Sequence, residues 1–331
     1  MEITILISSV GRRAQLIDCF RRSMRAMKLT GCIIGIDCSS SAPGAHLVDH
    51  FIKVPGCATP DFLATILRLC EQHRVSLLVP TIDTELSIYA RHRADFAAVG
   101  TTVVISASET VSVCADKFIS HSWLVENDFP TVRQGTSGQV VARPSDWEFP
   151  LIAKPRRGSA SVGVRILHSL DSLLDFSKDR EDLVVEEIAR GFEYTVNVFV
   201  NREGQCVCAV PHRRLEVRAG EVSKGVTVRH RKMMEFASLV SERLPGAYGP
   251  LNLQGFLSSD DEFRVTEINP RFGGGYPLAH QAGADFPRWL IEEWLGLPSS
   301  ASFDGWQDGL AMLRYDSAVF LPSQELENHR P

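Results

Sequence analysis

The sequence predicts an α/β domain over residues 1–110, followed by an α+β part over the rest of the chain. Three observations support this order. Strand and helix patterns alternate in the first part, and short strands with glycine-containing turns follow from Val132 onward. The length of 331 residues corresponds to about two domains of ~150 residues each. Strands that alternate with helices are typical of a parallel, helix-covered sheet.

The first domain opens with a strand at Ile3–Ser8, because this is a short apolar run. A helix is expected from Arg12 to Met27, where apolar residues recur at helical spacing. The same patterns predict the remaining elements of this domain: strands at Cys32–Asp37, Leu77–Pro80 and Thr102–Ile105, and helices at Phe62–Leu69 and Thr84–Phe96.

A helical connector is expected at Val111–Asn127, ahead of Pro130. The following elements are then expected in chain order: strands at Leu151–Lys154, Gly163–Leu167, Leu183–Glu187, Tyr194–Val200 and Gln205–Pro211, a helix at Lys232–Leu244, strands at Gly249–Leu257 and Phe263–Ile268, and a helix at Phe286–Trp294. We place the domain boundaries at residues 1–110, 111–187 and 188–331.

The composition is that of a globular protein, with 44% apolar and 23% charged residues. Lysine and arginine (35) nearly balance aspartate and glutamate (40), so the net charge is -5 and a broad nucleic-acid surface is not expected. No apolar run reaches the ~18 residues that span a bilayer. Arginines follow the apolar run Ile3–Ile7, the reverse of a signal peptide. We expect no nucleic-acid or membrane partner.

The eight cysteines are isolated or alternate along a strand, with no CxxC motif and no His/Cys knuckle. This spacing favours buried, reduced thiols over disulfides or a structural zinc site. We therefore expect a cytoplasmic protein.

A dinucleotide site is the first alternative for the α/β domain, because Gly11 follows the first strand. The turn Ser8–Arg13 lacks the GxGxxG spacing that lets a backbone approach a pyrophosphate. Asp37 ends the second strand and is a candidate ribose ligand, although aspartate is also a common turn residue. We expect a Rossmann-like domain that frames a site built mainly elsewhere.

The first cluster with chemical meaning joins Lys154 to the Gly/Ser-rich loop Gly158–Gly163. Small residues let backbone N–H groups approach phosphate oxygens, and the lysine supplies a positive charge. An ordinary hairpin turn is the alternative. The absence of GKS/T and the strand that follows exclude a Walker A loop.

A second cluster is acidic. Glu186 and Glu187 end a strand, and Glu193 follows a glycine turn. This arrangement would present backbone groups to an adenine edge and a carboxylate to ribose hydroxyls. A solvated acidic turn is the alternative.

The third cluster is the most specific. Asn252 and Gln254 share one strand face, and Glu267 and Asn269 share a face of the next strand. Their oxygens suit magnesium, which also binds nucleotide phosphates. Arg271 follows a proline turn, where its guanidinium would hold a transferring phosphoryl group.

The fourth cluster is the basic segment His212–Lys224, which suggests anion binding. Arg214, Glu216 and Arg218 would share one face of an extended segment. We expect Arg214 or Arg218 to bind a substrate carboxylate, because the arginine fork suits that group. A surface hairpin neutralised by its own glutamates is the alternative.

These clusters, in this order, resemble the ATP-grasp superfamily, and most closely a stand-alone, single-unit member of its carbamoyl-phosphate-synthase large-subunit-like branch. The resemblance is most specific over Asp116–Trp294. It implies a Rossmann-like pre-ATP-grasp domain (1–110), a connector helix with the small lid subdomain (111–187) and a C-terminal ATP-grasp subdomain (188–331). ATP would lie between the two α+β subdomains, with the Lys154–Gly163 hairpin closing over it.

The resemblance also assigns a role to each site residue by motif position. Phosphates would be contacted by Lys117, Lys154, Gly158, Ser159 and Ser161, adenine by Glu186, Glu187 and Ile188, ribose by Glu193, and metal by Gln254, Glu267 and Asn269, while Arg271, Lys154 and Asn269 would serve catalysis. The implied cofactors are ATP and two Mg²⁺ ions, with Mn²⁺ as the alternative metal.

The leading functional prediction is an ATP-dependent carboxylate–amine ligase that forms an amide through an acyl phosphate, with an amino-acid-like substrate. One alternative is kinase-like phosphorylation of bicarbonate or carbamate, and another is a non-catalytic ATP-binding regulatory module. The expected partners are a small-molecule carboxylate and amine. The sequence leaves a homodimer open.

Overall fold

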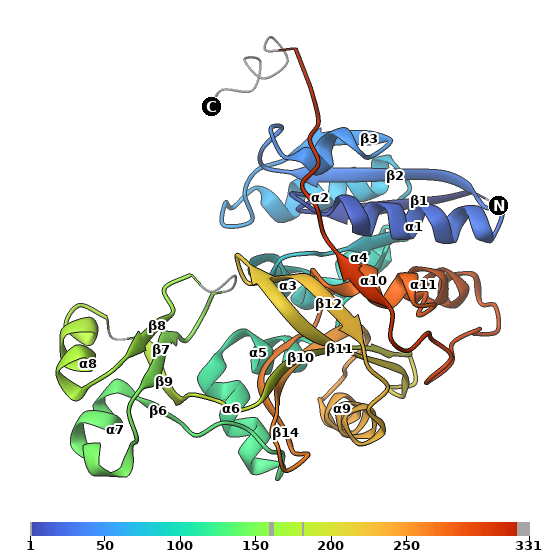
Figure 1. The fold of residues 1–331 in the computed structure, drawn as a ribbon. Helices are drawn as coiled ribbons and strands as arrows, with labels where there is room; N and C mark the ends of the chain where they lie inside the picture. Colours follow the sequence, from blue (N-terminus) through green and yellow to red (C-terminus); the bar gives the residue numbers. More distant parts are fainter. Residues whose placement is uncertain (1, 159–161, 181, 323–331) are drawn as a thin grey trace.

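The computed structural model describes residues 2–158, 162–180 and 182–322, which form three β-sheets (Figure 1). A five-stranded sheet belongs to the first part of the chain, and a four-stranded and a six-stranded sheet follow. The predicted fold class, an α/β domain followed by an α+β part, is confirmed.

The first sheet is parallel, with strand order β3-β2-β1-β4-β5. Its elements are β1 (Glu2–Ser8), α1 (Ala14–Ala26), β2 (Thr30–Asp37), the short 3-10 helix η1 (Pro43–His46), β3 (His50–Lys53), α2 (Phe62–Gln72), β4 (Leu77–Val79), α3 (Asp83–Arg91), α4 (Arg93–Ala98) and β5 (Thr102–Val103). Successive strands are therefore added on one side of β1 up to β3 and on its other side from β4 onward, so the strand order reverses between the neighbours β1 and β4.

Side chains alternate between the two faces of this sheet. Ile3, Ile5 and Ile7 of β1 pack in the same core as α1, whereas Leu6 packs in the core that contains α2, α3 and α4. This two-residue period explains why a short apolar strand sits between two helical layers. Asp37 accepts hydrogen bonds from the backbone N–H groups of Gly11 (3.0 Å) and Ser39 (3.0 Å), so it stabilises turns.

Two long helices expected from the sequence are each divided. The connector consists of α5 (Ser108–Ala115) and α6 (Lys117–Glu126). Asp116 divides them because its carboxylate accepts from two backbone N–H groups of the first turn of α6, which is the role of an N-cap. Thr84–Phe96 is likewise divided between α3 and α4.

The second sheet has the order β6-β9-β7-β8 and its own small core, in which Val140, Leu151 and Phe176 are buried. Its elements are β6 (Gln134–Thr136), α7 (Ser137–Ala142), the 3-10 helix η2 (Pro144–Asp146), β7 (Leu151–Pro155), β8 (Arg165–Leu167), α8 (Leu170–Ser177) and β9 (Leu183–Glu187). We call this unit the small subdomain; it projects from the rest of the molecule in Figure 1.

The third sheet is antiparallel, with the order β14-β13-β10-β11-β12-β15. Its strands and helices are β10 (Phe192–Val200), β11 (Cys206–Arg218), β12 (Glu221–Thr227), α9 (Arg231–Arg243), β13 (Gly249–Leu257), β14 (Phe263–Asn269), α10 (Tyr276–Gln281), α11 (Phe286–Leu295) and β15 (Ala311–Leu313). β11 extends beyond the predicted end at Pro211 and pairs with β12, so the basic segment is a strand hairpin within the sheet.

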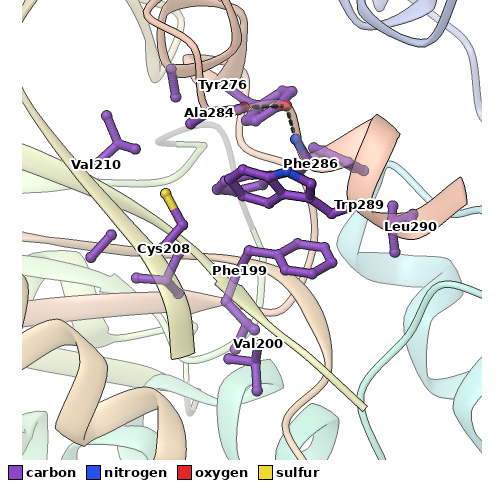
Figure 2. Packing of buried hydrophobic residues seen from close by; sticks show 14 of the residues in the cluster. Phe199, Val200, Cys208, Val210, Tyr276, Ala284, Phe286, Trp289 and Leu290 are labelled. Atoms are coloured by element: carbon purple, nitrogen blue, oxygen red, sulfur yellow. Dashed lines mark hydrogen bonds between the residues drawn. The ribbon is translucent and has the colours of Figure 1, made fainter. Parts of the chain in front are cut away.

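One continuous core joins the first domain to the third sheet, because residues of α1 pack in the same cluster as residues of β10, α9 and α11. Figure 2 shows part of it: Phe199 packs against Phe286 and Trp289, and Phe286 also packs against Tyr276. The Tyr276 hydroxyl donates to the carbonyl of Ala284 (2.9 Å) and accepts from the N–H of Phe286 (2.9 Å). This aromatic cluster anchors the end of the glycine loop that precedes Tyr276.

The eight cysteines are all free thiols. Within the described residues, no helix has both the length and the apolar character needed to cross a membrane. The three domain boundaries proposed from the sequence stay predictions.

Candidate nucleotide and phosphoryl-transfer site

The main candidate site is a cavity of about 460 Å³ lined by the second and third sheets, by loops, and by residues that follow strands of the first sheet. The first domain contributes Arg13, Ile82 and Asp83. Lys117 and the small subdomain form one wall, and the third sheet forms another. The cavity therefore collects residues that are far apart in the sequence, from Arg13 to Gly275.

The first domain reaches this cavity through the carboxyl ends of two neighbouring strands. Arg13 follows β1, and Asp83 follows β4. The strand order reverses between these two strands, and ligand sites in open α/β sheets form at such a point. The buried carboxylate of Glu85 holds the two loops together, because it accepts from the Ser8 hydroxyl (2.6 Å) and the Thr81 N–H (2.8 Å).

Lys154, predicted to contact phosphate, lies on β7 and faces the cavity. Its Nζ lies 2.7 Å from a carboxylate oxygen of Glu186 on the neighbouring strand β9, and the two side chains are only 11% and 5% exposed. The other Glu186 oxygen accepts from Gln134 (2.6 Å). The pair thus keeps a positive charge fixed beside the residues predicted to contact adenine.

Lys117, the second predicted phosphate ligand, begins α6 and also lines the cavity. Its Nζ donates to the carbonyl of Gly158 (2.8 Å). Burial lowers the pKa of Lys117 and the charge of Lys154 lowers it further, while Glu267 opposes both. Mutual repulsion between two ammonium groups in one cavity is relieved when an anion binds between them.

The loop after Lys154 begins and ends with glycines in the left-handed region, with φ of +123° at Gly158 and +76° at Gly163. Glycine adopts this conformation without steric cost. Gly158 lines the cavity. Ser159 and Ser161, predicted to contact phosphate, lie outside the described residues.

The residues predicted to bind metal lie on paired strands. Asn252 on β13 is opposite Asn269 on β14, and Gln254 is opposite Glu267. All four line the cavity. The amide of Asn269 donates to the Asn252 oxygen (3.3 Å), and the Gln254 oxygen accepts from Arg214 (2.9 Å).

The donor set fits a magnesium ion that shares its ligands with phosphate. Glu267 is half-buried, and no described residue donates a hydrogen bond to its carboxylate or pairs with it. Among the residues that the structure describes, no group of three or more His, Cys, Asp or Glu side chains would hold a metal alone. Magnesium commonly takes one or two carboxylates and completes its shell with phosphate oxygens and water.

Arg271, the predicted phosphoryl-facing residue, is held by the first domain. Its guanidinium donates to both oxygens of Asp83, at 2.7 and 2.6 Å. A third bond reaches the Asn269 side-chain oxygen (3.3 Å). The arginine is thereby oriented from two sides, and Asp83 was not identified from the sequence.

Arg214 is 4% exposed and lines the cavity, and its two terminal nitrogens are engaged, whereas its buried Nε has no hydrogen-bond partner among the described residues. The terminal nitrogens reach Glu193 (3.0 Å), Gln254 (2.9 Å) and the carbonyl of Gly220 (2.9 Å). Burial raises the pKa of Glu193, and the charge of Arg214 opposes that effect. The structure thus connects Arg214 to the residue predicted to hold ribose.

Arg218 is not among the described residues that line the cavity. It is 61% exposed and pairs with Glu216 at 2.9 Å. The expected shared face of Arg214, Glu216 and Arg218 is wrong, because the β11–β12 pairing shifts register after Arg214 and again after Glu216. Val217 lines the cavity instead.

Several cavity residues were not identified from the sequence: Arg13, Asp83 and Glu221 provide charge, and Val132, Ile152 and Phe256 provide apolar surface. Arg13 and Asp83 had a signal, since both follow predicted strands of a parallel sheet. Isolated apolar residues carry no such signal.

Two families match this chain. Residues 5–104 match the PylC-like N-terminal domain, and residues 179–316 match the family described as ATP-grasp in the biosynthetic pathway with Ter operon. The fold and this charged cavity between domains define an ATP-grasp protein. The chain belongs to the ATP-grasp superfamily. Its place in the carbamoyl-phosphate-synthase-like branch stays a prediction.

The chain is also similar to individual curated proteins. It is 31% identical over 134 residues to a D-alanine–D-alanine ligase of Aquifex aeolicus (strain VF5). This aligned region covers 37% of this chain and 44% of that protein. It is 22% identical over 209 residues to the mitochondrial methylcrotonoyl-CoA carboxylase subunit alpha of Dictyostelium discoideum, over 56% of this chain and 30% of that one. The matches span less than half the length of these relatives.

Solved structures share the fold across almost the whole chain. The biotin carboxylase domain of Hydrogenobacter thermophilus 2-oxoglutarate carboxylase, in complex with MgADP, ADP and bicarbonate, superposes with a TM-score of 0.73 at 14% identity, covering 93% of this chain and 73% of that chain. N5-carboxyaminoimidazole synthetase from Staphylococcus aureus gives 0.70 at 16% identity, covering 91% and 80%.

Proposed function

We propose that this protein is an ATP-dependent ligase that joins a carboxylate to an amine through an acyl phosphate. The observation that carries the proposal is the grouping of Lys117, Lys154 and Arg271 around one cavity together with the carboxylate of Glu267. Phosphoryl transfer depends on such positioning and neutralisation of phosphate oxygens. The match to a D-alanine–D-alanine ligase supports ligation and an amino-acid-like substrate.

The apolar part of the cavity suits the base of ATP. Val132, just before β6, and Ile152 of β7 line it, and Phe256 lines it from β13. Glu187 and Ile188, at the end of β9, would present backbone groups to the adenine edge, and Glu193 would accept from ribose hydroxyls. The MgADP in the Hydrogenobacter thermophilus structure supports nucleotide binding by this fold.

Bound Mg²⁺ would supply additional positive charge at the phosphoryl group. Glu267 is the first ligand we assign, because its carboxylate has no partner among the described residues. Asn269 is the second, since its side-chain oxygen makes only a 3.3 Å bond to Arg271. The Gln254 oxygen accepts one hydrogen bond from Arg214, so it would join them through its second lone pair.

The chain's own cations would act on the transferring group directly. Lys154 and Lys117 would hold phosphate oxygens, and Arg271 would orient the γ-phosphoryl group toward the substrate carboxylate. Asp83 keeps the guanidinium fixed, so little reorganisation is needed as charge develops. The amine would then replace phosphate on the acyl carbon to form the amide.

The experiment is an ADP-release screen across amino acids, singly and in pairs, with mass spectrometry of the products and Glu267→Gln as the matched variant. We expect one carboxylate–amine combination to release ADP and phosphate and to give an amide. The folded variant should lose most of this turnover. A phosphorylated product would instead indicate kinase chemistry, and ATP binding without turnover on any pair would indicate a regulatory module.

A further inference from the structure

An ion-pair bridge joins the first domain, the β11–β12 hairpin and the segment after β15 at the cavity. Glu221 at the start of β12 pairs with Arg13 of the first domain (2.7 Å) and with Arg314 after β15 (3.1 Å). The three residues come from the two ends of the chain and from the β11–β12 hairpin. Arg13 and Glu221 line the cavity, so both charges of this pair face the space where a second substrate would lie.

The glycine loop before Tyr276 makes room for this bridge. A Cβ atom at Gly274 would lie 2.5–2.7 Å from the carboxyl group of Glu221, so a larger residue there would displace it. Arg314 also donates to the carbonyl of Gly274, and its backbone N–H donates to the carbonyl of Ser223 (2.9 Å). The C-terminal segment therefore holds both Glu221 and the loop in place.

Both charged groups keep capacity for a ligand. Arg13 donates from Nη1 to Glu221 and from Nη2 to the carbonyl of Thr81 (3.2 Å). A guanidinium has five N–H donors, and each carboxylate oxygen accepts two hydrogen bonds. Burial raises the pKa of Glu221, but Arg13 and Arg314 outweigh burial and the net shift is downward, which keeps the carboxylate charged.

We propose that this bridge recognises the amine substrate, and that this substrate is an α-amino acid: its carboxylate binds Arg13, its ammonium group binds Glu221, and Arg314 is a positioning residue that holds Glu221. The inference rests on the ligase function proposed above and specifies its substrate class. A simple amine would use Glu221 alone. A zwitterion would use both Arg13 and Glu221, which pair with each other at 2.7 Å and so lie side by side.

A bridge between domains could also be purely structural. The two roles differ in what they recognise. A structural bridge treats an amino acid and its α-carboxamide alike, because it contacts neither. A recognition site separates them, since only the amino acid carries the carboxylate that pairs with Arg13. Charged hydrogen bonds of this kind contribute about 10- to 100-fold in affinity.

The test uses the full chain and the active amino-acid pair from the screen, with the amine substrate compared against its α-carboxamide. The variants are Arg13→Ala and Arg314→Ala. Arg21→Ala is the matched control, because Arg21 pairs with Asp49 at 2.9 Å in the same domain and does not line the cavity. MgADP affinity is measured separately by calorimetry for every variant.

We expect Arg13→Ala to raise KM for the amino acid about 10- to 100-fold while leaving KM for the carboxamide and the MgADP affinity nearly unchanged. Arg314→Ala should raise KM for the amino acid less, and the control should match the unaltered protein. Equal rises for amino acid and carboxamide would overturn the inference, as would a screen in which no amino acid serves as amine. If the unaltered protein does not bind MgADP in the calorimetry, that result would instead refute the proposed function.

Discussion

Asp83 and Arg271 meet through two hydrogen bonds of 2.7 and 2.6 Å, although 188 residues separate them in the sequence. Asp83 begins α3 in the first domain, and Arg271 follows β14 in the third sheet. A bidentate pair of this type fixes both the position and the plane of the guanidinium. The first domain thus supplies the support for the arginine that we place at the phosphoryl group.

Asp83→Ala should therefore reduce turnover more than nucleotide binding. The arginine would keep its bond to Asn269 but lose the contact that orients its fork, and a misplacement of about 1 Å costs roughly 100-fold in rate. We expect a 10- to 100-fold loss of kcat, with KM for ATP nearly unchanged. Steady-state kinetics measures this, with Asp18→Ala as the control because Asp18 forms an exposed pair with Arg22. If kcat of Asp83→Ala is unchanged, the orientation of Arg271 by Asp83 does not contribute to catalysis.

Lys154 and Glu186 form a buried pair, so removing one partner leaves a charge without compensation. Lys154→Met should lower the free energy of unfolding by about 3–5 kcal/mol. The double variant Lys154→Met/Glu186→Gln should recover most of that loss, because both charges are gone, yet MgADP binding should stay weak. Urea unfolding and calorimetry check the two parts. If the double variant binds MgADP normally, Lys154 does not contribute to phosphate binding.

Arg214 and Arg218 make a matched pair for substitution, since both lie on β11 but only Arg214 lines the cavity. Arg218→Ala should change kinetics little, because its exposed pair with Glu216 is worth about 0–1 kcal/mol. Arg214→Ala should raise KM for ATP, since it releases Glu193. Kinetics with each substrate varied in turn decides this. A rise confined to the carboxylate substrate would instead restore the role first expected for Arg214.

His212 predicts a pH dependence of stability. Burial, with Arg214 and Arg314 nearby, lowers its pKa from 6.5 to about 3. Between these pH values the unfolded chain binds a proton that the folded chain does not, so stability falls as pH falls, by up to about 1.4 kcal/mol per pH unit. The Nδ1 atom lies 3.2 Å from the Asn197 amide, and His212→Asn preserves a partner there.

Urea unfolding at several pH values between about 7 and 4 checks this prediction. The unaltered protein should lose stability faster with acidification than His212→Asn does. Parallel curves for the two proteins would show that His212 is not the group responsible.

The sequence predicted the local elements of the cavity well, because strand and helix periodicity is a short-range property. Gln254 and Glu267 were expected on neighbouring strands, and the structure pairs them in register. The division at Asp116 also had a local signal, since aspartate before a helical run is a strong N-cap. That signal was outweighed by the continuous apolar pattern around it.

The contacts between domains had no such signal. Arg13 and Glu221 are separated by 208 residues, and nothing in either segment alone indicates the other. The face of Arg218 was mispredicted for a related reason: strict alternation assumes regular pairing, and the register shifts in β11–β12 depend on the partner strand. Pairing across the fold, rather than propensity, determines these positions.

The most direct test of the proposed reaction is the transfer of ¹⁸O from the substrate carboxylate to phosphate. The active substrate pair is incubated with ATP and Mg²⁺ after the carboxylate oxygens of the first substrate have been labelled, and the released phosphate is analysed by mass spectrometry. An acyl-phosphate route places one labelled oxygen in each phosphate that accompanies amide formation. Amide formation with unlabelled phosphate would contradict the account.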